Sequence, residues 1–190
     1  MKPHRSKKPS IHGFTLPELI TFIAVSVGLF QLAFSSFSHL IGSVQLGSAT
    51  RQFLSHYALA KTTALQRNKT IHLCVSDGSE CIDSEQWHEG WIIFEDKNDN
   101  LQAEADEILR VSEPLTSGYT LTSNTSSNHL VFSPNGRVVK SNGSLPLMTF
   151  RICNTAARPE NMNRNAREMV INGAGRVRLQ HGRNHITECL

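Results

Sequence analysis

Charge is nearly absent from one long stretch near the N-terminus. Between Phe14 and Phe34 the only charged residue is Glu18, and apolar residues fill most of the run. A helix of about 20 residues is long enough to cross roughly 30 Å of hydrocarbon. The flank before it lacks acids and carries four bases, at Lys2, Arg5, Lys7 and Lys8. By the positive-inside rule, this arrangement predicts a single membrane span with an exported C-terminal domain.

A small-residue cleavage site is also missing after the apolar run, where Phe34-Ser35-Ser36-Phe37 stands. An ordinary secretory signal peptide carries such a site, so that class is disfavoured. A plain membrane anchor does not explain Glu18, because a carboxylate in hydrocarbon is costly and usually functional.

A catalytic set is missing as well. The chain has nine histidines together with many serines and acids. None of them stands at a recognisable nucleophile–base spacing. The sequence therefore predicts a protein that is not an enzyme and that needs no cofactor.

Proline does not interrupt the chain between Pro17 and Lys69, and apolar residues recur at helical spacing beyond the apolar run. This pattern predicts one helix from Phe14 to about Lys69, with an amphipathic second half. From Thr70 onward, short β-type runs alternate with turn residues. The nine predicted strands are 71–76, 90–95, 107–112, 119–122, 129–133, 137–140, 147–154, 168–171 and 176–180. The fold class is α+β, with a long N-terminal helix packed on antiparallel β-sheet.

Charge is unevenly distributed in the rest of the chain. Residues 71–115 contain twelve acids and two bases, whereas residues 116–190 contain nine Lys or Arg and three acids. The sequence pI of about 8.8 is misleading, because the four bases before the apolar run exceed the net charge of +3. The basic C-terminal part predicts a face for an anionic partner, or a part that complements the acidic middle across the fold.

Four cysteines allow three disulfide pairings. Local spacing favours Cys74–Cys81 and Cys153–Cys189, and an exported domain permits both. The spacing between Cys74 and Cys81 does not fit a zinc knuckle, so no metal is predicted there.

A second candidate metal site is the series Asp96-x-Asn98-x-Asn100 with Glu107. It fits several positions of a calcium-binding loop. However, Leu101 stands where that loop requires glycine, and no pair of helices flanks it. A polar turn is the favoured interpretation.

The opening Gly13-Phe14-Thr15-Leu16-Pro17-Glu18, with its basic flank and apolar run, resembles a type IV prepilin. The resemblance implies that a prepilin peptidase removes the leader 1–13 by cleaving after Gly13 and N-methylates Phe14. It implies a membrane and assembly segment, 14–41, and a globular domain, 42–190. Glu18 would pair with the N-terminal amine of a neighbouring pilin during assembly. The protein would be held in the bacterial inner membrane, with its globular domain in the periplasm, and enter a pilus with other pilins.

Four later segments are similar to the GspH/FimT family of minor pilins and pseudopilins. These are Gly90-Trp91-Ile92-Ile93-Phe94-Glu95-Asp96-Lys97-Asn98, Phe132-Ser133-Pro134-Asn135-Gly136-Arg137, Cys153-Asn154 and Gly175-Arg176-Val177-Arg178. In the FimT branch, a G-R-x-R motif is associated with DNA binding during natural transformation. The loop between Asn154 and Arg167 is longer than is usual in that family.

Arg176 and Arg178 are two residues apart in a predicted strand, so they point to the same face about 6.5–7 Å apart. Arginine forks suit phosphate contacts, which predicts binding to double-stranded DNA without sequence preference and with strong salt dependence. Together with these two, the candidate DNA-binding residues are Arg137, Arg164, Arg167 and Arg183. Alternatively, the arginines are solvated or pair with Glu168 or Glu188. The competing function is that of a structural pseudopilin in a type II secretion system.

Overall fold

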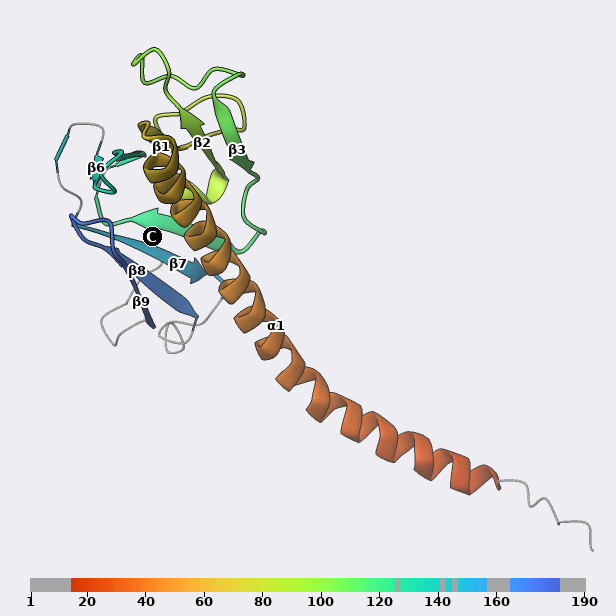
Figure 1. The fold of residues 1–190 in the computed structure, drawn as a ribbon. Helices are drawn as coiled ribbons and strands as arrows, with labels where there is room; N and C mark the ends of the chain where they lie inside the picture. The colour runs from red at the N-terminus through yellow and green to blue at the C-terminus, as the bar shows by residue number, and fades with distance from the viewer. Residues whose placement is uncertain (1–14, 126, 141–142, 145–146, 157–164, 182–190) are drawn as a thin grey trace, which may run out of the picture. The chain divides into compact units, whose positions relative to one another are not determined.

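A computed structural model describes residues 15–125, 127–140, 143–144, 147–156 and 165–181, without the side chains of residues 32–40 and 181. The chain divides into two compact units, Met1–Ile41 and Gly42–Leu190. Helix α1 (Leu16–Arg67) contributes to both (Figure 1). The predicted helix of 14–69 is therefore confirmed, with its first described turn at Leu16.

The start of α1 is capped by its own side chains. The Glu18 carboxylate accepts hydrogen bonds from the backbone N–H and the hydroxyl of Thr15, both at 3.4 Å. Thr15 and Glu18 have the T-x-x-E spacing of a capping box, and the acid also lies at the positive end of the helix dipole. Glu18 thus has a local role in this helix that the sequence analysis did not anticipate.

In the first unit, the large apolar side chains from Leu16 to Phe30 are exposed. The part of the chain that the structure describes contains no helix long and apolar enough to cross a membrane. The predicted span, 14–41, includes Phe14 and the side chains of 32–40, which lie outside the described residues. That span stays a prediction.

The end of α1 is set by a left-handed residue. Asn68 has a φ of 55°, and the N–H of Lys69 donates to the carbonyl of Ala64 at 3.3 Å. This is the hydrogen bond of a Schellman C-cap, in which asparagine is a tolerated substitute for glycine. Arg67 in the last turn complements the helix dipole and bonds Glu95 at 2.9 Å.

In the second unit, α1 buries one stripe of side chains. The buried positions recur every three or four residues, as expected for one face of a helix. They are Leu46, Thr50, Phe53, His56, Tyr57, Ala60, Thr63 and Ala64. We refer to these eight residues as the α1 stripe.

In the described part of the chain, nine antiparallel strands follow α1, and their bounds agree with the predicted ones to within two residues. They are β1 (Ile71–Val75), β2 (Trp91–Glu95), β3 (Ile108–Ser112), β4 (Tyr119–Ser123), β5 (His129–Phe132), β6 (Val138–Lys140), β7 (Met148–Asn154), β8 (Ala166–Ile171) and β9 (Val177–His181). A short 3-10 helix, η1 (Trp87–Glu89), precedes β2.

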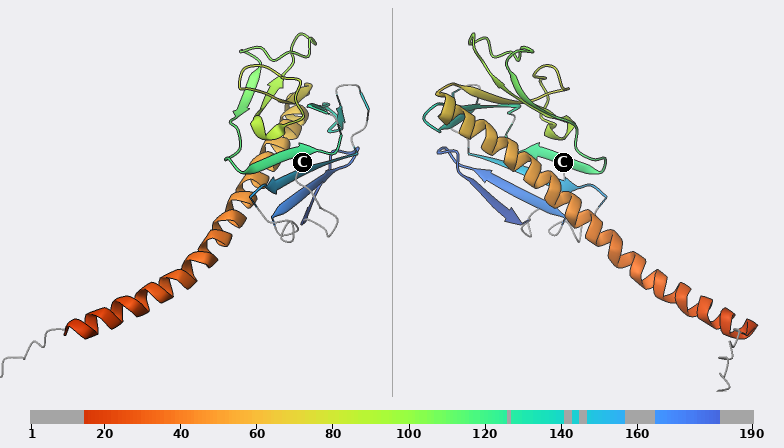
Figure 2. Two further views of the ribbon diagram at one scale, coloured as in Figure 1. Left: turned by 180° about the vertical axis from the view of Figure 1, so that it is seen from behind. Right: turned by 45° about the vertical axis from the view of Figure 1, so that its right-hand side comes forward.

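The strands form two sheets. One has the order β3-β2-β1-β5-β6 and the other the order β4-β7-β8-β9. The residue 42–67 part of α1 crosses strands of both sheets (Figures 1 and 2). Side chains of the α1 stripe share one hydrophobic core with the inward faces of the two sheets.

Phe53 is the centre of the aromatic part of this core. Its ring contacts Trp87, Trp91 and Phe150, with centroids 5.9, 5.4 and 4.6 Å away. The indole N–H of Trp91 donates to Nδ1 of His56 at 2.9 Å, so the buried polar atom is satisfied. Both tryptophans are fully buried, so they are residues of the hydrophobic core.

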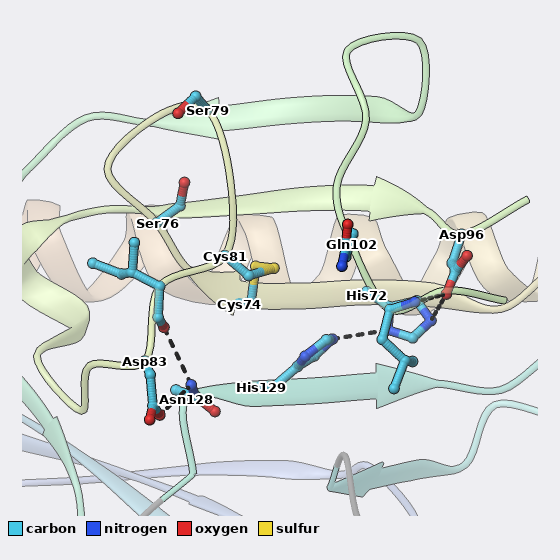
Figure 3. The surroundings of a disulfide bond; sticks show 12 residues. His72, Cys74, Ser76, Ser79, Cys81, Asp83, Asp96, Gln102, Asn128 and His129 are labelled. Carbon is cyan, nitrogen blue, oxygen red and sulfur yellow. Dashed lines mark hydrogen bonds and ion pairs between the residues drawn. A yellow bond between two sulfur atoms is a disulfide. The ribbon is translucent and has the colours of Figure 1, made fainter. Parts of the chain in front are cut away.

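A disulfide joins Cys74 of β1 to Cys81, and this predicted pair is confirmed (Figure 3). It closes a short loop at the end of β1, where Ser76 and Cys81 also form a β-bridge. Cys153 of β7 is also disulfide-bonded. Its predicted partner, Cys189, lies outside the described residues.

Two histidines are buried side by side between β1 and β5. Nδ1 of His72 lies 2.8 Å from Nε2 of His129, and the opposite ring nitrogen of His72 is 3.9 Å from Asp96 (Figure 3). Burial, followed by the charge of His72, lowers the pKa of His129 from 6.5 to about 4. Burial also lowers the pKa of His72, against the opposing effect of Asp96.

The histidine pair predicts a loss of stability in mild acid. Above pH 6.5 the pair contributes fully, because folded and unfolded chains both hold neutral imidazoles. As the pH falls from 6.5 towards 4, the imidazoles of this pair are protonated in the unfolded chain but stay neutral in the folded chain. The free energy of unfolding therefore decreases by about 2–3 kcal/mol. Chemical denaturation of the full-length protein in detergent at each pH measures this loss.

His129→Gln should remove much of this pH dependence between pH 6.5 and 5. The matched control is His88→Gln, which changes a histidine outside the pair. Equal slopes for wild type and His129→Gln would contradict the assignment.

Candidate nucleic-acid interface

The G-R-x-R segment lies at the turn between β8 and β9. The N–H of Gly175 donates to the carbonyl of Asn172 at 2.8 Å, and the Asn172 side-chain oxygen accepts the N–H of Arg176 at 2.9 Å. Gly175 has a φ of 67°, a left-handed conformation that favours glycine. These bonds fix where Arg176 leaves the turn and where β9 begins.

Two side chains of α1 hold this turn in place. The Tyr57 hydroxyl donates to the Gly175 carbonyl at 3.2 Å, and Lys61 Nζ donates to the same carbonyl at 2.8 Å and to the Ala174 carbonyl at 3.2 Å. Burial raises the pKa of the Tyr57 hydroxyl, so it remains a donor at neutral pH. Lys61 was not predicted at this site, although it lies one helical turn beyond Tyr57.

A second turn packs against the first. A side chain at Gly175 would meet Val138 Cγ2 at 2.7 Å and the Gly136 carbonyl oxygen at 3.3 Å. Gly136 and Val138 flank Arg137 in the β5–β6 turn, where Asn135 accepts the N–H of Arg137 at 3.0 Å. The turn that carries Arg176 therefore lies beside the turn that carries Arg137, although the two belong to different sheets.

Arg176 and Arg178 point to the same side of the β8–β9 hairpin. Val177 between them packs against the core, and both arginine side chains are exposed. Successive residues of a strand alternate between faces, so the two guanidinium groups emerge on the outer face. We refer to Arg137, Arg176 and Arg178 as the basic surface.

The acid that could neutralise this surface is occupied elsewhere. Glu168 is buried and accepts two hydrogen bonds from Arg151, at 3.0 and 3.2 Å. Among the described residues, no ion pair involves Arg137, Arg176 or Arg178, and none joins an acid of residues 71–115 to an arginine of residues 116–190. Glu188, the other acid considered as a partner, lies outside the described residues.

Arg167 does not join the basic surface. Arg167 pairs in register with His181 and shares its sheet face with Met169 and Ile171, so it lies on the face opposite to Arg178. Arg164, Arg183, Gly13 and Phe14 lie outside the described residues. Within the described part of the chain, no group of three or more His, Cys, Asp or Glu side chains is placed to hold a metal ion.

A family model described as "Type II transport protein GspH" matches residues 49–175, which is most of the globular unit. The chain belongs to the GspH family. Its members are type IV pilin-like proteins, minor pilins and pseudopilins rather than enzymes. A search of curated proteins finds no match for this GspH-family chain.

Two solved structures share the fold of this GspH-family protein. The minor pilin FimU of Pseudomonas aeruginosa is 21% identical, with a TM-score of 0.55 over 72% of this chain and 89% of FimU. The minor pseudopilin EpsH from the type 2 secretion system of Vibrio cholerae is 11% identical, with a TM-score of 0.51 over 72% of this chain and 97% of EpsH. These matches establish the type IV pilin-like architecture, with an N-terminal helix packed on antiparallel sheets.

Gly175→Ala should disrupt the contact between the two turns. The new methyl group meets Val138 at 2.7 Å and Lys61 Nζ at 3.0 Å, in addition to the strain of a left-handed alanine. Gly143→Ala is the matched control, because Gly143 has a φ of 77° and nothing within 4 Å of the added atom. We expect Gly175→Ala to lower the free energy of unfolding by about 1–3 kcal/mol more than the control does. An equal loss of unfolding free energy in Gly175→Ala and Gly143→Ala, measured by chemical denaturation, would contradict the close packing of the two turns.

Proposed function

We propose that this GspH-family protein is a FimT-like minor type IV pilin that binds double-stranded DNA through its basic surface and supports DNA uptake in natural transformation. The observation that carries the proposal is the packing of the β5–β6 and β8–β9 turns, which gathers Arg137, Arg176 and Arg178 from separate parts of the chain. The exposure of Arg176 and Arg178, without ion pairs among the described residues, leaves their guanidinium groups available to phosphate.

The spacing of the arginines suits a phosphate backbone. Arg176 and Arg178 are separated by two residues of extended chain, about 6.5–7 Å, which is comparable to the distance between successive phosphates. Lys61 adds a positive charge beside the turn, where it bonds two backbone carbonyls. The basic surface offers no pattern of base-reading side chains, so contacts to phosphate would dominate and binding would be independent of sequence.

The N-terminal part of the proposal concerns processing and assembly. Prepilin peptidase would cleave after Gly13 and N-methylate Phe14, and the exposed apolar face of α1 would join other pilins. The protein would first be held in the inner membrane with its globular unit in the periplasm. During assembly the Glu18 carboxylate would exchange its long 3.4 Å bonds with Thr15 for the N-terminal amine of a neighbouring subunit.

Removing two arginines should weaken DNA binding. We expect Arg176→Ala/Arg178→Ala to reduce the affinity of the full-length protein for duplex DNA by about tenfold or more, because two phosphate contacts are lost. The dependence of log K on log salt should also become shallower by about 2. Fluorescence anisotropy with labelled duplexes of two unrelated sequences, at two salt concentrations, measures both effects.

The matched control for that experiment is Arg51→Ala/Arg110→Ala. It removes the same charge from exposed arginines on α1 and β3, outside the basic surface. Affinity close to wild type in this control and loss in the test variant support the proposal. Equal affinity in all three proteins, or no binding by wild type, would refute it.

A structural role in a type II secretion system is the second candidate. It is favoured by the description of the matching family and by the shared fold of EpsH. In that role the basic surface would face a neighbouring subunit or a secreted protein. Absence of DNA binding by wild type, with the protein folded, would favour this alternative.

A further inference from the structure

The loop between β2 and β3 concentrates negative charge. From Glu95 to Glu107 the chain has six acids and a single base, Lys97. Two of the acids have cationic partners, since Glu95 bonds Arg67 at 2.9 Å and Asp106 bonds Lys97 at 2.6 Å. No Lys or Arg pairs with the other four acids among the described residues. The loop therefore has an unbalanced negative charge that would attract a cation.

The backbone of this loop takes the turn that a calcium-binding loop needs. Leu101, the sixth residue counted from Asp96, has a φ of 62°. The carboxylate of Asp96 accepts the N–H of Leu101 at 2.8 Å and that of Asn100 at 3.1 Å. The leucine at this position was one of two sequence-based reasons to favour a plain polar turn, the other being the absence of a flanking pair of helices. In the structure it adopts the left-handed conformation for which glycine is normally required.

Oxygen-bearing side chains converge inside the turn. The side-chain oxygens of Asn98 and Asn100 accept the N–H groups two residues later, at 3.2 and 2.8 Å. The amide nitrogens of both residues donate to the same oxygen of Glu104, at 3.1 Å. Positions three, five and nine of the loop are thus drawn together.

An independent observation comes from Glu107, the twelfth residue of the loop. Glu107 is only 2% exposed. Its Oε1 accepts the N–H of Lys97 at 2.8 Å, which directs the carboxylate towards the start of the loop. Its Oε2 is buried without a hydrogen-bond partner among the described residues. A buried, unsatisfied carboxylate oxygen is costly, and a bound cation would satisfy it.

We propose that the loop of residues 96–107 binds one Ca²⁺ ion. The donors would be the side chains of Asp96, Asn98, Asn100 and Glu107 with the carbonyl of Gln102, and Glu104 would act through a water molecule. In the order named, these residues are positions 1, 3, 5, 12, 7 and 9 of a twelve-residue loop. The donors are all oxygen, which selects a hard cation over zinc. Only two of the direct donors are carboxylates, so we expect weak binding, with a Kd on the order of 10⁻⁴–10⁻³ M.

Calorimetric titration of the chelator-treated full-length protein with CaCl₂ tests this site without DNA. We expect one bound Ca²⁺ per chain and a Tm that rises with the Ca²⁺ concentration. Glu107→Gln should weaken binding by about tenfold or more, because the bidentate ligand at position 12 is lost. The matched control is Asp106→Asn, which removes the same charge from a neighbouring exposed acid. Its Kd should stay within about twofold of the wild-type value, since diffuse attraction is screened by salt.

A gain-of-function variant keeps the test decisive if Glu107→Gln fails to fold. Asn98→Asp adds a third carboxylate at position 3 and should bind Ca²⁺ more tightly than wild type. Absence of Ca²⁺ binding by wild type would overturn the proposal. So would equal weakening by Glu107→Gln and Asp106→Asn, or unchanged affinity in Asn98→Asp.

Discussion

Burial of the α1 stripe is the constraint on which the globular unit depends. The two antiparallel sheets share no strand, and the helix supplies side chains to the inward face of each. Phe53 contacts aromatic rings from both sheets and from the turn at η1. Truncating such a ring in a closely packed core typically costs 3–5 kcal/mol, which is a large part of the stability of a domain.

The same helix face also organises the basic surface. Tyr57 belongs to the stripe, and Lys61 follows it by one turn, so the packing that forms the core also places two donors on the Gly175 carbonyl. The β8–β9 turn then lies against the β5–β6 turn. The acidic loop 96–107 lies at β2 and β3, the edge of the five-stranded sheet opposite to β6. The basic surface and the acidic loop thus lie apart in this fold, and no ion pair among the described residues joins them.

The local elements could be predicted from the sequence because their signals are local. Short apolar runs bounded by turn residues predicted the nine strands. The short separation of Cys74 and Cys81 in the sequence predicted their disulfide. The division into two sheets depends on pairings between distant strands, such as Ile71 with Phe132, and the bond from Tyr57 to Gly175 spans 118 positions, so neither appears in any local pattern. The left-handed conformation of Leu101 also escaped prediction, since it is held by hydrogen bonds to Asp96 rather than by residue type.

In the proposed function, two turns from different sheets form one DNA-binding surface. Hydrogen–deuterium exchange of the full-length protein, with and without duplex DNA, measures whether the two turns bind together. DNA should protect the backbone amides of residues 135–140 and 173–180 together, while those of β3 and the loop 96–107 exchange unchanged. Protection of only one of the two turns, or of the acidic loop instead, would refute this shared surface.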